Sequence, residues 1–199
     1  MKLIKGTVTV VTPILIESNT IYGRTLRGAI GEVAYYNNMS ISKVFPDWDT
    51  DQLIVRDCKA RNDIVTSIIH TSRSQFNAIC DGEFSFEILV EMDYLEDILE
   101  IITQKVHVGK RTSSGYGEIK FNSIVTSQAN MIPSGKSVDL ITPAVTDVKH
   151  DRVITLMKKI DNTPEFIPLK LMEPGVKVEL SKPGYGFGKY ISLGFGEIS

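Results

Sequence analysis

The sequence carries one glycine-rich segment twice, at residues 109–119 and 188–198. The first copy reads Gly-Lys-Arg-Thr-Ser-Ser-Gly-Tyr-Gly-Glu-Ile and the second reads Gly-Lys-Tyr-Ile-Ser-Leu-Gly-Phe-Gly-Glu-Ile, so seven of eleven positions are identical. A Thr-Pro pair precedes each copy, 97 residues before the first and 46 residues before the second. Repeats of this kind indicate duplicated structural units. We therefore predict two related units, of which the second is shortened and packs against the first.

The first part of the chain predicts an α+β unit. Alternating apolar and polar residues are typical of a strand at 82–91, and apolar residues at helical spacing predict helices at 26–36 and 94–104. Further strands are expected at 2–16, 53–55, 64–70 and 118–125. With 53–55 and 64–70 taken as short strand-like pieces, strand, helix, strands, helix and strand follow the β-α-β-β-α-β order of a ferredoxin-like, RRM-like fold. Two glycines inside the first helix, Gly28 and Gly31, weaken it and indicate close approach of the sheet or of a ligand.

The second part predicts a reduced ferredoxin-like unit. Residues 127–137 have the Ser, Asn, Pro and Gly content of a linker. We therefore divide the chain into an RRM-like domain at 1–126, this linker, and a second, reduced RRM-like unit at 138–199. Within the second unit we expect a strand ending in Thr142-Pro143, a short helix at 151–160 and a strand at 175–180.

Composition limits the classes of function. The formal net charge is −2 and the pI is near 5.9, so the chain lacks the overall basic charge typical of nucleic-acid coats. RNA binding would therefore have to come from a local patch. No apolar run reaches the roughly 20 residues that span a bilayer, and the N-terminus has no secretion signal, so we expect a cytoplasmic protein without membrane partners. Cys58 and Cys80 form no metal or disulfide pattern.

The glycine loops combine backbone freedom with groups that suit phosphate. Glycine permits positive φ, and successive exposed N–H groups can bind an anion. Around Gly109 and Gly115 the first copy adds the side chains of Lys110, Arg111, Thr112, Ser113 and Ser114. Cations and hydroxyls of this kind contact the phosphate backbone of RNA. The alternative is a plain turn between a helix and a strand, in which Tyr116 and Phe195 are core residues.

The two copies are not equivalent in chemistry. The second has Tyr190, Ile191 and Leu193 where the first has Arg111, Thr112 and Ser114. We therefore expect 109–119 to bind RNA and 188–198 largely to hold the two halves together. Neither loop has the Walker pattern or the strand–turn–helix context of a Rossmann fold, so we expect no nucleotide cofactor.

The first loop resembles the signature glycine loop of the RAMP superfamily, the RRM-like RNA-binding subunits of CRISPR systems. The segment Tyr22-Gly23-Arg24-Thr25-Leu26-Arg27-Gly28-Ala29 looks like the other motif of that superfamily, with Tyr22 and Arg24 in place of the usual Pro and Ser. Residues 171–176 are similar to the strand entry before the last loop in two-domain members. The resemblance implies a non-catalytic subunit that binds the crRNA 5′ handle and contacts a large subunit of an effector complex. The cations that we place on RNA are Arg24, Arg27, Lys110, Arg111 and Lys189, with Arg73 as a further candidate.

Two other functions remain open. Repeat-processing endoribonucleases of this superfamily use an acid–base histidine, and His70, at a strand end beside Ser72 and Arg73, is the candidate here. Of the other histidines, we expect His107 to contact ligand or to pack and His150 to be solvated. The segment 17–20 lacks the Asp on which the cleaving backbone subunits depend. The second alternative is a scaffold subunit whose loops contact protein and which has no RNA affinity alone.

We expect no metal site. Asp47, Asp49 and Asp51 lie close together, but the glycine and terminal glutamate of a calcium loop are missing. A solvated acidic turn is the better interpretation. Phe45 and Trp48 beside it are expected to form a contact surface for a neighbouring subunit.

Overall fold

The structure is a computed structural model that describes residues 1–16, 18–71, 74–147, 152–160 and 163–199. Its main sheet has the order β3-β7-β1-β9-β8, with β4 also paired to β7. These strands are β1 (Lys2–Val10), β3 (Leu53–Val55), β4 (Lys59–Ala60), β7 (Glu83–Val90), β8 (Val106–His107) and β9 (Glu118–Gln128). The order β3-β7-β1-β9, antiparallel throughout, is that of a ferredoxin-like sheet. The predicted α+β fold of the first unit is therefore confirmed.

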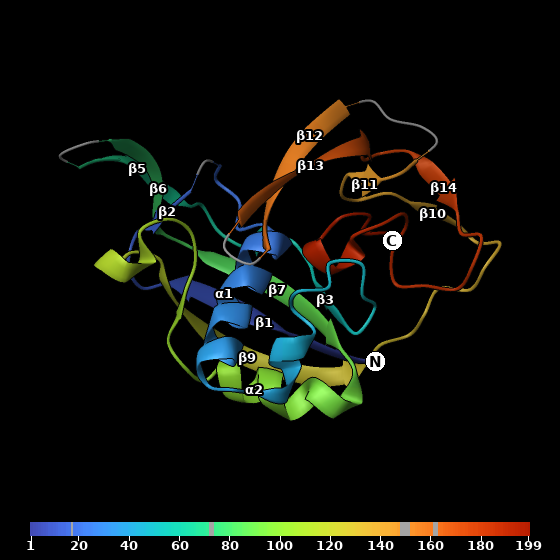
Figure 1. The fold of residues 1–199 in the computed structure, drawn as a ribbon, viewed down its shortest axis with the longest axis horizontal. Helices are drawn as coiled ribbons and strands as arrows, with labels where there is room; N and C mark the ends of the chain where they lie inside the picture. Colours follow the sequence, from blue (N-terminus) through green and yellow to red (C-terminus); the bar gives the residue numbers. More distant parts are fainter. Residues whose placement is uncertain (17, 72–73, 148–151, 161–162) are drawn as a thin grey trace.

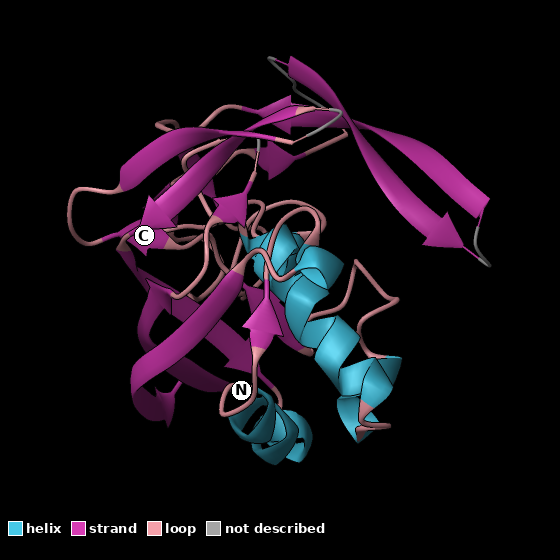
Figure 2. Cartoon of the chain, turned by 90° about the vertical axis from the view of Figure 1, so that its left-hand side faces the viewer, coloured by secondary structure: helices cyan, strands magenta, loops and turns pink. Residues whose placement is uncertain are grey.

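Two helices, α1 (Gly23–Tyr36) and α2 (Leu95–Ile101), cover one face of this sheet (Figures 1 and 2). The alternation in β7 buries Phe84, Phe86 and Ile88 beneath them. Leu26 and Ile30 of α1 join the same cluster, as helical spacing predicted. No helix in the described residues is long and apolar enough to cross a membrane.

A second, smaller sheet extends from the first unit. It has the order β2-β6-β5 and consists of β2 (Ile14–Leu15), β5 (Val65–His70) and β6 (Gln75–Asp81). The predicted strand at 2–16 is thus split into β1 and β2, with Pro13 between them. The hairpin of β5 and β6 lies at the end of the molecule away from α2 (Figure 1).

The second half of the chain is built from strands. They are β10 (Ser137–Asp139), β11 (Ala144–Val145), β12 (Arg152–Ile160), β13 (Thr163–Met172) and β14 (Lys177–Glu179). The predicted helix at 151–160 is therefore wrong in its described part, because residues 152–160 pair with β13 along their whole length. The β-branched run Val153-Ile154-Thr155 suits a strand, and cross-strand pairing overrides the helical spacing.

The described residues of the second half repeat several strand pairings of the first half and contain no α-helix. β10 pairs with β14 as β1 pairs with β7. The sheet β11-β13-β12 matches β2-β6-β5 in order and direction. The bridge between Leu140 and Ile198 corresponds to the pair Val10 and Ile119. β9 ends at Gln128, so the first two residues of the predicted linker belong to a strand; the domain boundaries themselves stay a prediction.

Candidate RNA interface

The two glycine loops have the same backbone and the same attachment. Thr12 Oγ1 donates to the carbonyl of Gly115 over 3.0 Å and accepts the N–H of Glu118 over 2.9 Å. Thr142 Oγ1 makes the equivalent bonds to Gly194 and Glu197, over 2.8 and 2.9 Å. The N–H groups of Gly117 and Gly196 each donate over 2.9 Å to the carbonyl of the proline that follows the threonine. The repeated Thr-Pro pairs are therefore the docking points of the repeated loops.

Glycine is required sterically at one matched position. A Cβ on Gly117 would lie 1.9 Å from the carbonyl oxygen of Val108, and a Cβ on Gly196 would lie 1.9 Å from that of Phe187. Both glycines have positive φ, 80° and 65°. Only glycine combines that conformation with so close an approach of backbone. The shared glycines therefore set the shape of each loop, whatever its other residues do.

The loops differ in exposure. In the first, Lys110, Arg111 and the segment 113–115 are exposed, and no atom lies within 4 Å of a Cβ built on Gly115. In the second, residues 192–198 are all buried. A Cβ on Gly194 would meet Asp57 Oδ1 at 2.8 Å. Residues 113–115 of the first loop thus face solvent, whereas the equivalent residues of the second loop, 192–194, lie inside the molecule.

The buried loop joins the two halves. Ser192 Oγ donates to the carbonyl of Trp48, and Glu197 Oε1 lies 2.8 Å from Lys59 Nζ. Trp48 itself packs against the cluster that contains Val145 and Leu193. The expectation that Trp48 and Phe45 form an outer contact surface is wrong, because both pack internally, Phe45 against the first core. The second glycine loop contacts Trp48.

Arg111 is presented to solvent on an aromatic support. Its guanidinium lies 5.1 Å from the ring centre of Phe76 in β6. Such stacking orients the planar group and leaves its N–H edge for an anion. Arg24, at the start of α1, is held in a similar way, 4.1 Å from the ring centre of Tyr22.

Arg27 is not presented to solvent. Its side chain is buried, and its guanidinium donates to the carbonyls of Val44, Phe45 and Asp47 over 3.2, 2.7 and 2.9 Å. Burial lowers the pKa of Arg27 to about 10, with the nearby Asp47 acting in the opposite direction. The predicted RNA contact of Arg27 is therefore replaced by a structural one, which ties α1 to the segment 44–47.

Lys189 is the counterpart of Lys110 and has a carboxylate partner. Its Nζ lies 2.7 Å from Asp147 Oδ2, and the hydrogen bond to this carboxylate raises the pKa of Lys189. The backbones of the two lysines are attached in the same way: Lys110 N donates to the carbonyl of Leu15 over 2.8 Å, and Lys189 N donates to that of Val145 over 3.0 Å. The predicted RNA contact of Lys189 would compete with its ion pair.

The N-terminus of α1 is also occupied. The N–H of Gly23 donates to Asp57 Oδ1 over 2.6 Å. Burial raises the pKa of Asp57, while this hydrogen bond and the charge of Arg24 act against the rise. A carboxylate thus already lies where the positive end of the helix dipole could otherwise bind phosphate.

Of the described histidines, His107 contacts the first loop, whereas His70 lies apart from Arg111. In the β5–β6 hairpin, Ile69 pairs with Phe76 and His70 pairs with Gln75. Because successive strand residues point to opposite faces, His70 lies on the face opposite Phe76 and Arg111. His107 Nδ1 lies 3.1 Å from the carbonyl of Tyr116 inside the loop region. His150, Arg73, Ser72 and Glu17 lie outside the described residues.

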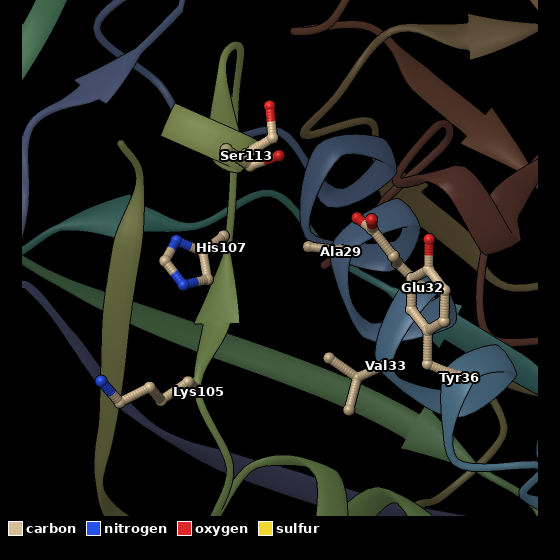
Figure 3. Close-up of a pocket in the computed structure, with 8 residues that line it drawn as sticks. Ala29, Glu32, Val33, Tyr36, Lys105, His107 and Ser113 are labelled. Atoms are coloured by element: carbon tan, nitrogen blue, oxygen red, sulfur yellow. The ribbon is translucent and has the colours of Figure 1, made fainter. Parts of the chain in front are cut away.

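A cleft of about 250 Å³ adjoins the first loop. One wall is α1, through Ala29, Glu32 and Tyr36; the other is the segment before and within the loop (Figure 3). Thr112 and Ser113 line the cleft as well as belonging to the loop. The ring of His107 extends away from α1 in this view. Sequence reasoning missed the cleft, for which only the helical spacing of Gly28, Glu32 and Tyr36 was a signal.

No group of histidine, cysteine and carboxylate side chains among the described residues is arranged to hold a metal ion. Both cysteines are free, and Cys58 is buried. The acidic turn at 47–51 instead makes local hydrogen bonds, such as that from Asp49 N to Asp47 Oδ1 over 3.0 Å.

Solved structures share the fold of this chain, among them the following three. One is described as CRISPR associated protein Cas6, with a TM-score of 0.50 and 12% identity over 100% of this chain and 98% of that one. A protein from a Cas6-related gene of Pyrococcus furiosus matches with a TM-score of 0.54 and 14% identity, over 100% and 97%. A RAMP protein described as binding different RNA substrates matches with a TM-score of 0.51 and 12% identity, over 100% and 99%. No family model matches the chain, and no curated protein matches its sequence. The fold is therefore the RAMP and Cas6 fold that the loop resemblance implied.

Proposed function

From the fold that this chain shares with Cas6 and RAMP proteins, we propose that it is an RNA-binding subunit of a CRISPR ribonucleoprotein. Its first glycine loop holds the backbone of single-stranded crRNA at the 5′ handle, and the protein contacts a large subunit without cleaving RNA. One observation carries this proposal: of two loops with the same backbone, the first exposes Arg111 and Ser114, whereas the second has Tyr190 and Leu193 at these positions and is buried over 192–198. A purely structural loop would not need that difference.

The exposed loop has the groups that bind a phosphate chain. Lys110 and Arg111 supply charge, and Ser113 and Ser114 supply hydroxyl donors. Arg111 over Phe76 adds the combination of cation and aromatic ring that single-strand binders use. A structure with this fold is described as a RAMP protein binding different RNA substrates, which supports the same class of ligand.

The test is a titration of the full chain with single-stranded RNA at several salt concentrations, followed by fluorescence anisotropy. Each phosphate contact contributes about 0.7 to the log–log salt slope for a single strand. Arg111→Ala is expected to weaken binding and to reduce the slope by about that amount. Lys189→Ala, which removes a cation of the second loop that is paired with Asp147, is expected to leave both unchanged. A wild-type slope near zero, or equal losses in both variants, contradicts the proposal.

Cleavage is the second candidate, supported by the likeness to Cas6 structures over the whole chain. The candidate residue remains His70, whose side chain is exposed. It lies on the opposite face of its hairpin from Arg111, which separates it from the proposed clamp. If the purified protein cuts a hairpin repeat RNA and His70→Ala abolishes the cut, the endoribonuclease replaces the non-catalytic subunit as the function.

A scaffold role is the remaining alternative. It predicts that the isolated chain has no RNA affinity at any salt concentration and that it co-purifies with a large subunit. RNA crosslinking within that complex separates the two cases. Crosslinks to 109–115 support the clamp, and their absence from a complex that contains crRNA supports the scaffold.

A further inference from the structure

The cleft between α1 and the first loop lies beside the residues proposed to bind phosphate. Thr112 and Ser113 line it from the loop, and Glu32 and Tyr36 line it from α1 (Figure 3). A volume of about 250 Å³ holds about eight waters at about 30 Å³ each. A pyrimidine base has a similar number of heavy atoms. The cleft therefore has room for one base that leaves the stack next to a bound phosphate.

Three residues of α1 form a stripe along this side. Gly28, Glu32 and Tyr36 are four residues apart, so they share a helix face. All three are exposed, and a Cβ on Gly28 would have no atom within 4 Å. Gly31, by contrast, is needed for packing, because its Cβ would lie 2.7 Å from the ring of Phe45. Gly28 weakens the helix although packing does not require a glycine there. Its missing side chain leaves the helix surface beside Glu32 flat.

Tyr36 supplies a stacking surface. It is 74% exposed, at the C-terminal end of α1. Its ring is held by Tyr35, with centroids 5.9 Å apart in an edge-to-face arrangement. Exposed aromatic rings next to a cationic phosphate site are the usual platform for unstacked RNA bases.

Glu32 supplies a carboxylate that can accept hydrogen bonds in the cleft. Among the described residues it has no ion pair and no hydrogen bond. An ionised carboxylate only accepts hydrogen bonds. It therefore favours a base with an exocyclic amino group, as in the pairing of Glu with cytosine N4. Uracil presents carbonyl oxygens on both sides of its single N–H and is disfavoured.

We propose that this cleft is a base-reading subsite that takes one nucleotide with an amino group, read by Glu32 and stacked on Tyr36. The inference rests on the proposed RNA-binding function and gives that function a sequence preference. Thr112 and Ser113 connect the two sites, since they belong to both. The phosphate clamp binds any sequence, and the cleft selects the base adjacent to it.

The test uses the full chain and short oligouridylate, with one cytidine introduced at each position in turn. One position is expected to raise affinity about fivefold or more over uridine. Glu32→Gln is expected to remove this gain, because an amide both donates and accepts and so accommodates uracil as well as cytosine.

The outcomes separate the two proposals. If oligouridylate binds with a normal salt slope but no position prefers cytidine, the base subsite is wrong and the clamp stands. If Glu32→Gln retains the cytidine preference, the subsite is also wrong. If no oligonucleotide binds at all, the proposed function itself fails.

Discussion

Arg111 and Tyr190 take the same left-handed backbone conformation, with φ of 57° in each, at the same position of the two glycine loops. That region is unfavourable for residues with a Cβ, so both loops hold strain at one point. Their side chains then diverge. The Arg111 guanidinium lies over Phe76 at the surface, whereas Tyr190 packs against the cluster of Val145 and Leu193. The backbone is common to the two loops, and the side chain decides what each does.

Substitutions at two glycines of the first loop can distinguish the cost of backbone strain from the cost of a steric clash. Gly115 and Gly117 have φ of 83° and 80°, but only Gly117 has a carbonyl oxygen in the place of a Cβ. Gly115→Ala is expected to cost about 1 kcal/mol of unfolding free energy, the penalty of the left-handed region. Gly117→Ala is expected to cost several times as much, measured by urea denaturation. Equal losses would show that the clash is relieved elsewhere.

Arg27 is expected to matter for stability and not for RNA. Arg27→Met leaves the carbonyls of Val44, Phe45 and Asp47 without their donor. Each unsatisfied buried group costs about 1–3 kcal/mol, so a loss of about 3 kcal/mol or more is expected in denaturant unfolding. The salt slope of RNA binding should stay that of the wild type, measured below the unfolding transition. A reduced slope with unchanged stability would return Arg27 to the RNA surface.

Asp57 gives stability a dependence on pH. Burial raises its pKa, so the native state binds a proton more readily than the unfolded chain does. The free energy of unfolding therefore falls as the pH rises from the unfolded value, about 3.9, through the raised native value. Asp57→Asn keeps an acceptor for the N–H of Gly23 and removes the titration. Unfolding of both proteins between about pH 4 and pH 7 should show the wild type gaining relative to the variant as the pH falls. A constant difference would contradict this.

The two thiols should differ in reactivity. Burial raises the pKa of Cys58 to about 12, with the charge of Asp57 adding to the rise, so its thiolate is scarce at neutral pH. Cys80 is partly exposed. Iodoacetamide is expected to label Cys80 in the folded protein and Cys58 only after denaturation, as read by peptide mass spectrometry. The Cys80→Ser variant, as control, should take up almost no label while folded, and rapid labelling of it would show that Cys58 is accessible.

The sequence pattern predicted the first unit well because local signals and tertiary pairing agree there. The alternation in β7 and the apolar stripes of α1 and α2 each match the face that is buried. The repeated Thr-Pro pairs and glycine loops also took the equivalent positions that their spacing implied.

The second unit was harder to predict from sequence because its longest strand, β13, contains prolines. β13 contains Pro164 and Pro168, which lower the expectation of a strand. Both are tolerated because β11 pairs only with Leu171 and Met172, so this part of β13 has a single neighbour, β12. Because β13 was not expected as a strand, no partner strand was expected for residues 152–160, and their apolar spacing favoured a helix.

For the site residues, the sequence did not predict which side chains are buried. Arg24 and Arg27 are three residues apart in the same motif, yet one stacks on Tyr22 and the other is enclosed by the segment 44–47. The distinction depends on how that segment folds over α1. The same holds for the two loops, whose residues indicated different roles but not the depth at which the second is buried.

The burial of the second loop has a consequence for how the protein comes apart. Gly194 lies against Asp57 and the backbone of Val55, and Ser192 bonds to Trp48, so neither half can detach without hydrating this shared interior. A sequence with two repeats would ordinarily suggest two melting transitions. Here the copy that no longer faces solvent couples the halves, and the protein is expected to lose its structure in one cooperative step.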